Sequence, residues 1–383
     1  MAVILALLCA MAGAQAKVIR VGVFLPFMQE GKKHVVTEYY RGLLMAVDSL
    51  SKTTPTNGES TTFNITAADC GNTATDMLAL LDESKNGVFQ IIFAPSNQNQ
   101  LKVLDNYSRL NGTKICVPFG GRYDEWITNP AFFALNVTQT DMAVPAYKLI
   151  TEALRARDIY IIDTHDGKNY CPLANYVKKY VKGAKVMEYP KKEKKILKLM
   201  GESNALLIPS SYDEKAQEAL IQMSRQTNGV KAAIIGYPAW YERGNTARTN
   251  KSQEANTAPN GGNSDMSAKT LGQLNAYVIQ PSYPLTTLPR VKHFAANYKA
   301  NFDASLPQEP FSYALWGFDT GYYLLKGLMR YGQDFNTQPL YAAPLQTKIR
   351  FSERAGGQGY INTAVLLLHY RQDGQIDIIQ PKE

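Results

Sequence analysis

Residues 18–50 read VIRVGVFLPFMQEGKKHVVTEYYRGLLMAVDSL, and this stretch decides the fold class. Val18–Phe27 is an apolar run closed by Pro26, which is typical of a strand buried on both faces. After a short polar segment, apolar side chains recur at helical spacing, at Tyr40, Leu43, Leu44, Val47 and Leu50. A buried strand followed by an amphipathic helix is the repeating unit of a parallel α/β sheet.

The same unit recurs along the rest of the chain. With helices between them, a first series predicts further strands at 63–70, 88–95, 114–119 and 132–138. A second series begins with a helix near Pro145 and predicts strands at 159–163, 185–189, 204–209, 231–236 and 276–280. A long helix from about residue 311 to residue 331 follows, and a hairpin around Asp373-Gly374 ends the pattern. Two successive series predict an α/β protein with two doubly wound, Rossmann-like lobes.

The first sixteen residues form an apolar run that is too short to span a bilayer and that ends in Ala14-Gln15-Ala16. This pattern is typical of a signal peptide with a small-residue cleavage site, although the first lysine comes only at Lys17. Cys9 lies in the middle of the run without a small residue before it, so we expect no lipid anchor. The sequence therefore predicts export to the periplasm with residues 1–16 removed.

The composition of the 383 residues, 45% hydrophobic and 19% charged, allows the chain to bury more than one core. Beyond the predicted signal peptide, Cys70, Cys116 and Cys171 are widely spaced and form no cluster with the four histidines. The spacing therefore supports neither a disulfide framework nor a metal site. Cys70 and Cys116 lie in apolar strand patterns, and we expect them to be buried free thiols.

The net charge of +8 is partly local, because nine lysines lie between Lys178 and Lys198. Two interpretations stay open: a solvated helix face with its loop, or attraction to an anionic partner in the cell envelope. Nucleic acid is disfavoured, because no aromatic and basic reader motif accompanies the lysines and export is expected. Residues 242–268 are rich in Asn, Thr, Ser and Gly, which predicts a mobile surface loop.

Ligands of open α/β sheets bind beyond the carboxyl ends of the strands, so the loops there hold the candidate site. In the first lobe, Ser96 and Asn97 follow a strand and begin a helix, where they can cap the helix, hold a carboxylate, or do both. Gly121 and Arg122 follow the next strand. The glycine allows close backbone approach to a ligand, and Arg122 can pair either with an anion or with Asp124 or Glu125 nearby.

In the second lobe, residues 163–170 follow a strand but match no metal-binding spacing, so we expect a solvated turn. Tyr170 begins the next helix and can reach the cleft. Tyr212, Tyr237 and Trp240 end later strands, where aromatic rings suit a stacking wall for a ligand. The alternative for Trp240 is packing between the lobes.

A search for catalytic patterns gives no candidate. The sequence has no nucleophile elbow, no phosphate loop and no set of histidines at metal spacing. Residues 28–31, which follow the first strand, read MQEG and cannot serve as a dinucleotide fingerprint. We therefore expect a protein that is not an enzyme, with no catalytic residue, cofactor or metal.

Several segments in order resemble the type I periplasmic binding proteins, in the branch with branched-chain amino-acid binding proteins and receptor ligand-binding regions. The strongest is the stretch GFDTGYYLL at 317–325, similar to the glycine–aromatic–aspartate helix of that family. The other segments, which carry the family's opening strand, first helix and third strand, are 18–26, 39–46 and 91–96. GYPAW at 236–240 and GQGYIN at 357–362 look like the Bacteroidetes subgroup, which is often linked to lysin-motif domains.

This resemblance implies a periplasmic solute-binding protein whose two lobes close by a hinge motion. It implies three crossings, near Asp141, near Pro284 and just before Ile349. Lobe I would then hold 17–140 and 284–348, and lobe II would hold 141–283 and 349–383. Position by position, the resemblance implies that Ser96 and Gly121–Arg122 hold the carboxylate side of a ligand. It implies that Tyr170, Tyr212 and the segment 237–240 close from the other lobe.

One departure from the family concerns specificity. Amino-acid binders place an acidic residue for the ligand's ammonium where this chain has Pro238-Ala239. The first hypothesis is therefore a binder of a small ligand, amino-acid-like, peptide or cell-wall fragment, working with an ABC-type transporter or an envelope sensor. The alternative is a structural or regulatory envelope protein that keeps the fold, has a degenerate pocket and acts through protein contacts. In either case we expect a monomer or a weak dimer.

Overall fold

The computed structural model describes residues 17–53, 60–82, 87–120, 128–155, 157–240, 267–282, 288–307, 311–338, 340–353 and 359–381. The expected signal peptide, Gly121, Arg122 and most of the polar segment 242–268 lie outside these residues. The last residues of that segment are described, and there Ser267 caps the short helix α10, Ala268–Gln273.

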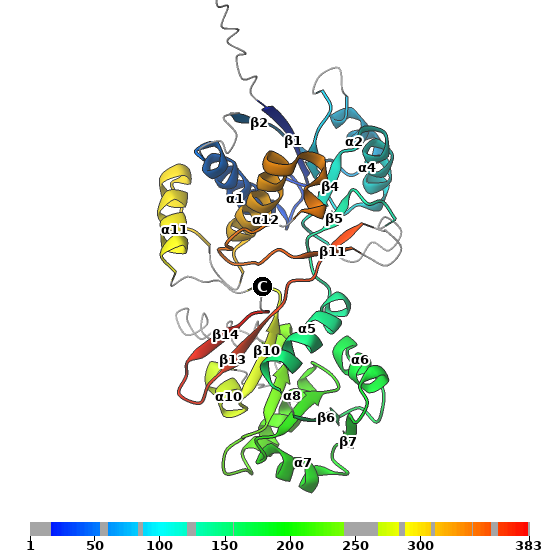
Figure 1. Cartoon of the computed structure of the whole chain (residues 1–383), viewed down its shortest axis with the longest axis vertical. Coiled ribbons are helices and arrows are strands. Elements are labelled where there is room, and N and C mark those ends of the chain that lie inside the picture. The colour runs from blue at the N-terminus through cyan, green and yellow to red at the C-terminus, as the bar shows by residue number, and fades with distance from the viewer. Residues whose placement is uncertain are drawn as a thin grey trace, which may run out of the picture.

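The chain forms two α/β lobes, each built on a seven-stranded sheet, which confirms the predicted fold class (Figure 1). Sheet A of lobe I has the order β11-β12-β5-β4-β3-β1-β2, and sheet B of lobe II has the order β14-β13-β10-β9-β8-β6-β7. The strands of sheet A are β1 Lys17–Leu25, β2 Thr61–Asp69, β3 Ile91–Phe93, β4 Lys114–Val117, β5 Phe132–Ala134, β11 Phe351–Glu353 and β12 Tyr360–Asn362. The strands of sheet B are β6 Asp158–Asp163, β7 Lys185–Glu188, β8 Ala205–Pro209, β9 Ala233–Gly236, β10 Ala276–Gln280, β13 Leu366–Tyr370 and β14 Ile376–Ile379.

Both lobes share one topology. In each sheet, the five strands that come first in the chain are parallel. The first of these five strands lies between the second and the third. Lobe I carries α1 Lys33–Ser51, α2 Ala74–Leu80, α4 Gln98–Asn111, α11 Pro289–Phe302, α12 Tyr313–Tyr331 and a 3-10 turn at Gly332–Thr337. Lobe II carries α5 Gln139–Ala153, α6 Pro172–Tyr180, α7 Glu193–Met200, α8 Glu214–Ser224 and α10. In a parallel sheet of this order, the strand ends of each lobe present their loops at one edge.

Each lobe has its own core. In lobe I, the inner strands bury both faces, with α1 and α12 packed on one side and α2 and α4 on the other. In lobe II, a single large cluster joins sheet B to its helices. The expected burial of Cys70 and Cys116 as free thiols is confirmed, and Cys171 is a third buried free thiol. No helix in the described part of the chain is long and apolar enough to cross a bilayer.

The stretch GFDTGYYLL owes its glycines to a close crossing of α1 and α12. A Cβ atom on Gly317 would lie 1.9 Å from the carbonyl oxygen of Tyr39, and one on Gly42 would lie 1.9 Å from that of Ala314. Beside this contact, the Tyr39 hydroxyl and Thr320 Oγ1 form a buried hydrogen bond of 2.8 Å. Because neither glycine has a side chain, α1 and α12 can cross in close contact, and this contact fixes the position of α12 on α1.

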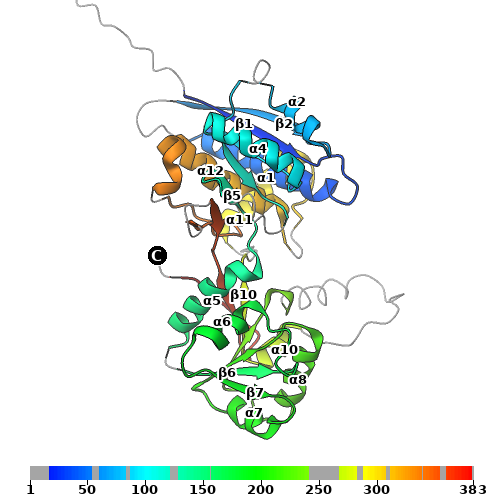
Figure 2. The same ribbon diagram turned by 90° about the vertical axis from the view of Figure 1, so that its right-hand side faces the viewer.

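The chain passes between the lobes after β5, after β10 and after β12 (Figures 1 and 2). The first passage lies close to the expected Asp141, and Pro284 is outside the described residues. The expected crossing just before Ile349 is wrong. β11 and β12 form an antiparallel pair whose second strand joins β5 at the edge of sheet A, so the chain reaches lobe II only after Asn362. The predicted closing hairpin is formed by β13 and β14.

Candidate functional site

A cavity of about 440 Å³ lies where the connecting segments meet the two lobes. Lobe I contributes the ends of β4 and β5 and the start of α12, and lobe II contributes the ends of β9 and β10. Its lining residues are Pro118, Phe119, Gly120, Leu135, Asn136, Val137, Pro238, Gln280, Pro281, Ser282, Phe311, Tyr313, Trp316, Thr347 and Asn362. A larger groove of about 760 Å³ lies on the outer face of lobe I along α1, α11 and α12. We take the smaller cavity as the site, because both lobes line it at the expected strand ends.

Four aromatic rings form the lobe I side of this cavity. The Phe119 and Tyr313 ring centroids lie 6.2 Å apart, those of Phe311 and Tyr313 lie 5.2 Å apart, and those of Phe311 and Trp316 lie 6.0 Å apart. Phe119, Phe311 and Tyr313 are partly exposed, whereas Trp316 is nearly buried behind them. Ser312 caps α12 by accepting a hydrogen bond from the Leu315 N–H, which fixes the helix start that carries three of these rings. The result is a rigid apolar wall that suits a flat or ring-bearing ligand.

The polar side chains that line the cavity are all uncharged among the described residues. Gln280, Ser282 and Asn362 are buried, and Gln280 donates a long hydrogen bond of 3.5 Å to the Pro238 carbonyl. Thr347 is 2% exposed, and its hydroxyl oxygen has no hydrogen-bond partner among the residues that the structure describes. A buried hydroxyl without a partner is costly, which makes Thr347 a natural contact for a ligand or an ordered water.

Thr347 is held in place by Asp319 of α12. The Asp319 carboxylate accepts hydrogen bonds from the backbone N–H groups of Leu345, Gln346 and Thr347 at 2.7, 2.8 and 2.7 Å. Burial raises the pKa of Asp319 to about 7, against the opposing effect of these three donors. The aspartate of the 317–325 stretch thus ties α12 to the segment that leads into β11 and lines the cavity.

Three of the four aromatic residues predicted in lobe II lie together. Tyr212 and Tyr237, and Tyr237 and Trp240, form edge-to-face pairs with centroids 6.1 Å apart in each case. The Trp240 indole N–H donates to the Tyr212 carbonyl at 3.3 Å, and its ring packs beside Gly236, where a Cβ atom would lie 2.9 Å from it. Trp240 has no exposed surface, whereas Tyr212 is 39% exposed. In this structure Trp240 supports the cluster from within lobe II, and Tyr212 is the ring that faces solvent.

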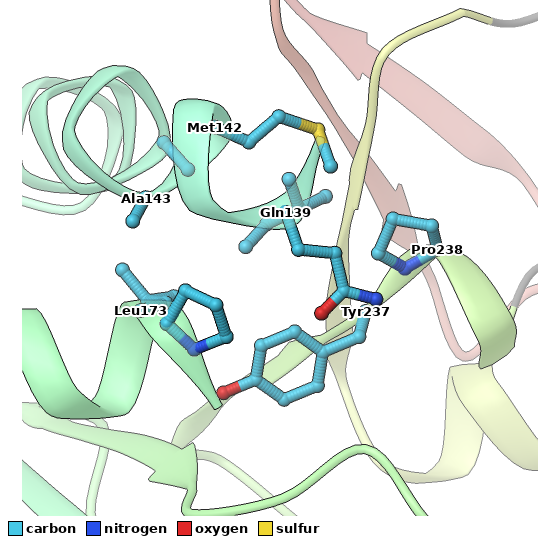
Figure 3. A pocket seen from close by; sticks show the side chains of 9 residues that line it. Gln139, Met142, Ala143, Leu173, Tyr237 and Pro238 are labelled. Atoms are coloured by element: carbon cyan, nitrogen blue, oxygen red, sulfur yellow. The ribbon is translucent and has the colours of Figure 1, made fainter. Parts of the chain in front are cut away.

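Tyr237 is also packed within lobe II. Its hydroxyl donates to the Pro209 carbonyl at 2.7 Å and accepts from the Cys171 thiol at 2.9 Å. Burial raises its pKa well above the usual value. Figure 3 shows the ring below Gln139 and Pro238, with the hydroxyl directed toward the start of α6. The pocket beside it measures about 10 Å³, which is room for about one water molecule, so it cannot hold a ligand.

Tyr170 lies in a turn organised by Asp163 at the end of β6. The buried Asp163 carboxylate accepts hydrogen bonds from the His165 N–H at 3.0 Å, the Gly167 N–H at 2.7 Å and the Tyr170 hydroxyl at 2.8 Å. Burial and the adjacent carboxylate raise the pKa of Tyr170. His165 also reaches Asp213 at 2.9 Å, which links this turn to the loop that carries Tyr212. Residues 166–169 of the segment predicted as a solvated turn are exposed, and Asp163 braces this turn from inside.

Of the four lobe I residues predicted to contact a ligand, the structure describes only Ser96 and Asn97. Asn97 caps α4 by accepting hydrogen bonds from the N–H groups of Asn99 and Gln100, and its amide donates to the Asn72 carbonyl. The capping interpretation of Asn97 is thereby confirmed. Ser96 is partly exposed at the end of β3. Neither residue lines the cavity, and Gly121 and Arg122 lie outside the described residues, directly after Gly120, which does line it.

The aromatic residues at the start of α12 were not among the site residues predicted from the sequence. The motif FSYALW at 311–316 places three rings within six residues at a helix N-terminus, and this density was the available signal. Thr347 and Asn362 carried no such signal, because their positions depend on the pairing of β11 and β12 with sheet A.

Comparison with known proteins gives a fold rather than a family. No family model and no curated protein sequence matches the chain. A structure described as a candidate branched-chain amino acid ABC transporter from Rhodospirillum rubrum matches with a TM-score of 0.60 and 13% identity, covering 95% of this chain and 100% of that one. A branched chain amino acid ABC transporter periplasmic ligand-binding protein from Burkholderia xenovorans LB400 matches with a TM-score of 0.52 and 10% identity, covering 94% of each chain. The chain therefore has the two-lobed fold of the type I periplasmic binding proteins.

Proposed function

We propose that this chain is an exported solute-binding protein whose lobes close on a small, ring-bearing ligand and present it for uptake or sensing. The observation that carries this proposal is the cavity at the lobe connections, which combines the aromatic wall with the unpartnered hydroxyl of Thr347. The periplasmic ligand-binding role in the name of the Burkholderia structure supports the same kind of function. The fold by itself does not assign it, because one fold serves many functions.

The position of the cavity couples ligand binding to lobe movement. Asn136 and Val137 belong to the first connecting segment, Pro281 and Ser282 begin the second, and Asn362 ends β12 before the third. A hinge rotation changes backbone angles in such segments while each lobe moves as a unit on its own core. A ligand that contacts these residues therefore stabilises one relative position of the lobes.

The lining chemistry defines the class of ligand. Aromatic faces stack on rings, and amide and hydroxyl groups meet polar substituents at a ligand's edge. Pro238 stands where an acidic residue would meet the ammonium of an amino acid, and no described lining residue is acidic. We therefore favour a ring-bearing metabolite, such as a nucleoside, a cell-wall sugar fragment or an aromatic peptide, over a simple aliphatic amino acid.

Residues beyond the cavity complete the binding surface in this proposal. Tyr212 and Tyr170 approach from lobe II as the lobes close, and Ser96, Gly121 and Arg122 receive the ligand from lobe I. Arg122 would meet an anionic substituent if the ligand carries one. Trp240 and Tyr237 act by holding Tyr212 in place, since both are buried.

The test is a calorimetric titration of a ligand panel, selected first by thermal shift, that includes amino acids, aromatic peptides, nucleosides and cell-wall fragments. We expect saturable binding of a ring-bearing member and at least a roughly tenfold loss of affinity in Tyr313→Ala. Tyr313→Phe should keep most of the affinity, because it retains the ring. The matched control is Tyr341→Ala, which removes a tyrosine that is 61% exposed on the outer face of lobe I. Equal affinities in Tyr313→Ala and wild type would overturn this assignment of the site.

A further inference from the structure

A dense lysine surface covers one edge of lobe II. Between Lys178 and Lys198 the chain has nine lysines and two glutamates, which is nearly the whole net charge of +8. All nine lysines are exposed, and they lie at the end of α6, in the edge strand β7, along α7 and in the turns that join these elements. We call this set, Lys178, Lys179, Lys182, Lys185, Lys191, Lys192, Lys194, Lys195 and Lys198, the lysine edge.

Structural roles account for only part of the lysine edge. Lys178 and Lys179 lie in the last turn of α6, where they oppose the negative end of the helix dipole. Lys185 lies on the edge strand β7, where a lysine discourages pairing with another strand. Lys191 pairs with Glu188 at 3.0 Å, and Lys192 reaches the Val186 carbonyl at 3.5 Å.

The outer face of α7 has the clearest surplus of charge. Lys194, Lys195 and Lys198 lie three or four residues apart along α7 and so share one face, and Lys191 lies in the turn just before the helix. The opposite face of the helix is buried through Ile196, Leu199 and Met200. Apart from the Lys191–Glu188 pair, no ion pair joins these four lysines to another described residue. Like charges at this spacing repel one another, so the face is costly to the folded protein unless anions approach it.

The chemistry of the lysine edge favours a lipid surface over a protein partner. Protein interfaces are depleted in lysine, and none of the cavities described for this chain is lined by a residue of the lysine edge. Lysine ammonium groups on flexible stems can meet many phosphate headgroups without a shaped site. Tyr180, 62% exposed between Lys179 and Lys182, is the kind of ring that sits at a membrane interface.

We infer that the lysine edge docks this protein on a bilayer rich in anionic phospholipid headgroups. Figures 1 and 2 place α7 at the end of lobe II that is farthest from lobe I. Docking through this end leaves the cavity at the lobe connections free to open and close. The protein would thereby stay close to a membrane, held by a contact that salt weakens.

The test is co-sedimentation of the full mature chain with vesicles of phosphatidylcholine alone and of phosphatidylcholine with 30% phosphatidylglycerol. We expect binding to the anionic vesicles only, and release at high salt. Each lysine near such a surface strengthens binding about fivefold, so replacing Lys182, Lys194, Lys195 and Lys198 by Gln should lower the partition coefficient at least a hundredfold. These four side chains are exposed, so the fold should survive, which circular dichroism checks.

The matched control replaces four exposed lysines of lobe I, Lys32, Lys33, Lys102 and Lys292, by Gln, with the same change of net charge. We expect this variant to bind anionic vesicles within about fivefold of wild type. A wild-type protein that ignores anionic vesicles at low salt would overturn the inference, and so would an equal loss in both variants. Vesicle binding that survives the lysine-edge substitutions, while binding to an acidic protein is lost, would instead assign the surface to a protein partner.

Discussion

The crossing of α1 and α12 gives a sharp prediction for Gly42→Ala. A new Cβ atom there would lie 1.9 Å from the Ala314 carbonyl oxygen, whereas 3.4 Å begins the range of ordinary contact. The obstacle is backbone, so no side-chain rotation can relieve it. The two helices must separate by about 1.5 Å at this point. This shift would loosen the contact of α1 with Gly317 and the hydrogen bond of Tyr39 to Thr320.

Two opposing effects set the magnitude for Gly42→Ala. Alanine in a helix interior is favoured over glycine by about 1 kcal/mol. Overpacking of a tight contact costs about 1–3 kcal/mol, and a backbone obstacle belongs at the upper end of that range. The net expectation is a loss of about 2 kcal/mol, which for a lobe of this size lowers its unfolding midpoint by roughly 4–8 °C.

The assay is differential scanning calorimetry of wild type, Gly42→Ala and a control, Gly201→Ala. Gly201 follows α7 with ordinary helical backbone angles, and a Cβ atom there would have its nearest contact at 3.4 Å. The control should change the free energy of unfolding by less than about 0.5 kcal/mol. A Gly42→Ala protein at least as stable as wild type would refute the argument that this glycine is required by close helix packing.

Three further predictions concern buried groups. Burial raises the pKa of Asp319 to about 7, so protonation of this group adds to the free energy of unfolding. This contribution is complete below about pH 4 and disappears as the pH rises through 7. The free energy of unfolding of Asp319→Asn, measured in urea, should lack this pH dependence. If it varied with pH in parallel with that of wild type, the assignment to Asp319 would be wrong. Trp240→Ala should destabilise lobe II by about 3–5 kcal/mol, whereas Tyr212→Ala should cost less than about 1 kcal/mol, and equal losses in urea would count against the buried assignment. The three buried cysteines have raised pKa values, so they should react with a thiol reagent at pH 8 only after denaturation, and rapid labelling of the native protein would disagree with their burial.

The fold could be predicted from the sequence because its inner strands are apolar on both faces. In inner strands such as β3, β8, β9 and β10, continuous burial distinguishes a parallel sheet between helices from a half-exposed sheet. Two such series of strands and helices predict two lobes, and the two sheets do have the same strand order. The third lobe crossing was misplaced, because β11 and β12 are short and their local pattern does not say which sheet edge they join.

The candidate site was harder to predict. Sequence position placed Tyr212, Tyr237 and Trp240 at strand ends, where they do lie together. Their exposure could not be read from the sequence, since it depends on how Trp240 packs beside Gly236. Thr347 likewise faces the cavity only because Asp319, distant in sequence, accepts hydrogen bonds from its segment. Such long-range contacts leave no periodic signal.

Ligand binding is tested most directly by native mass spectrometry of the protein purified without denaturation from its own cells. We expect a bound small molecule with an aromatic or sugar ring, and a much smaller bound fraction in Tyr313→Ala than in Tyr341→Ala. A mass equal to the bare mature chain in every preparation, with no ligand recovered after unfolding, would contradict it.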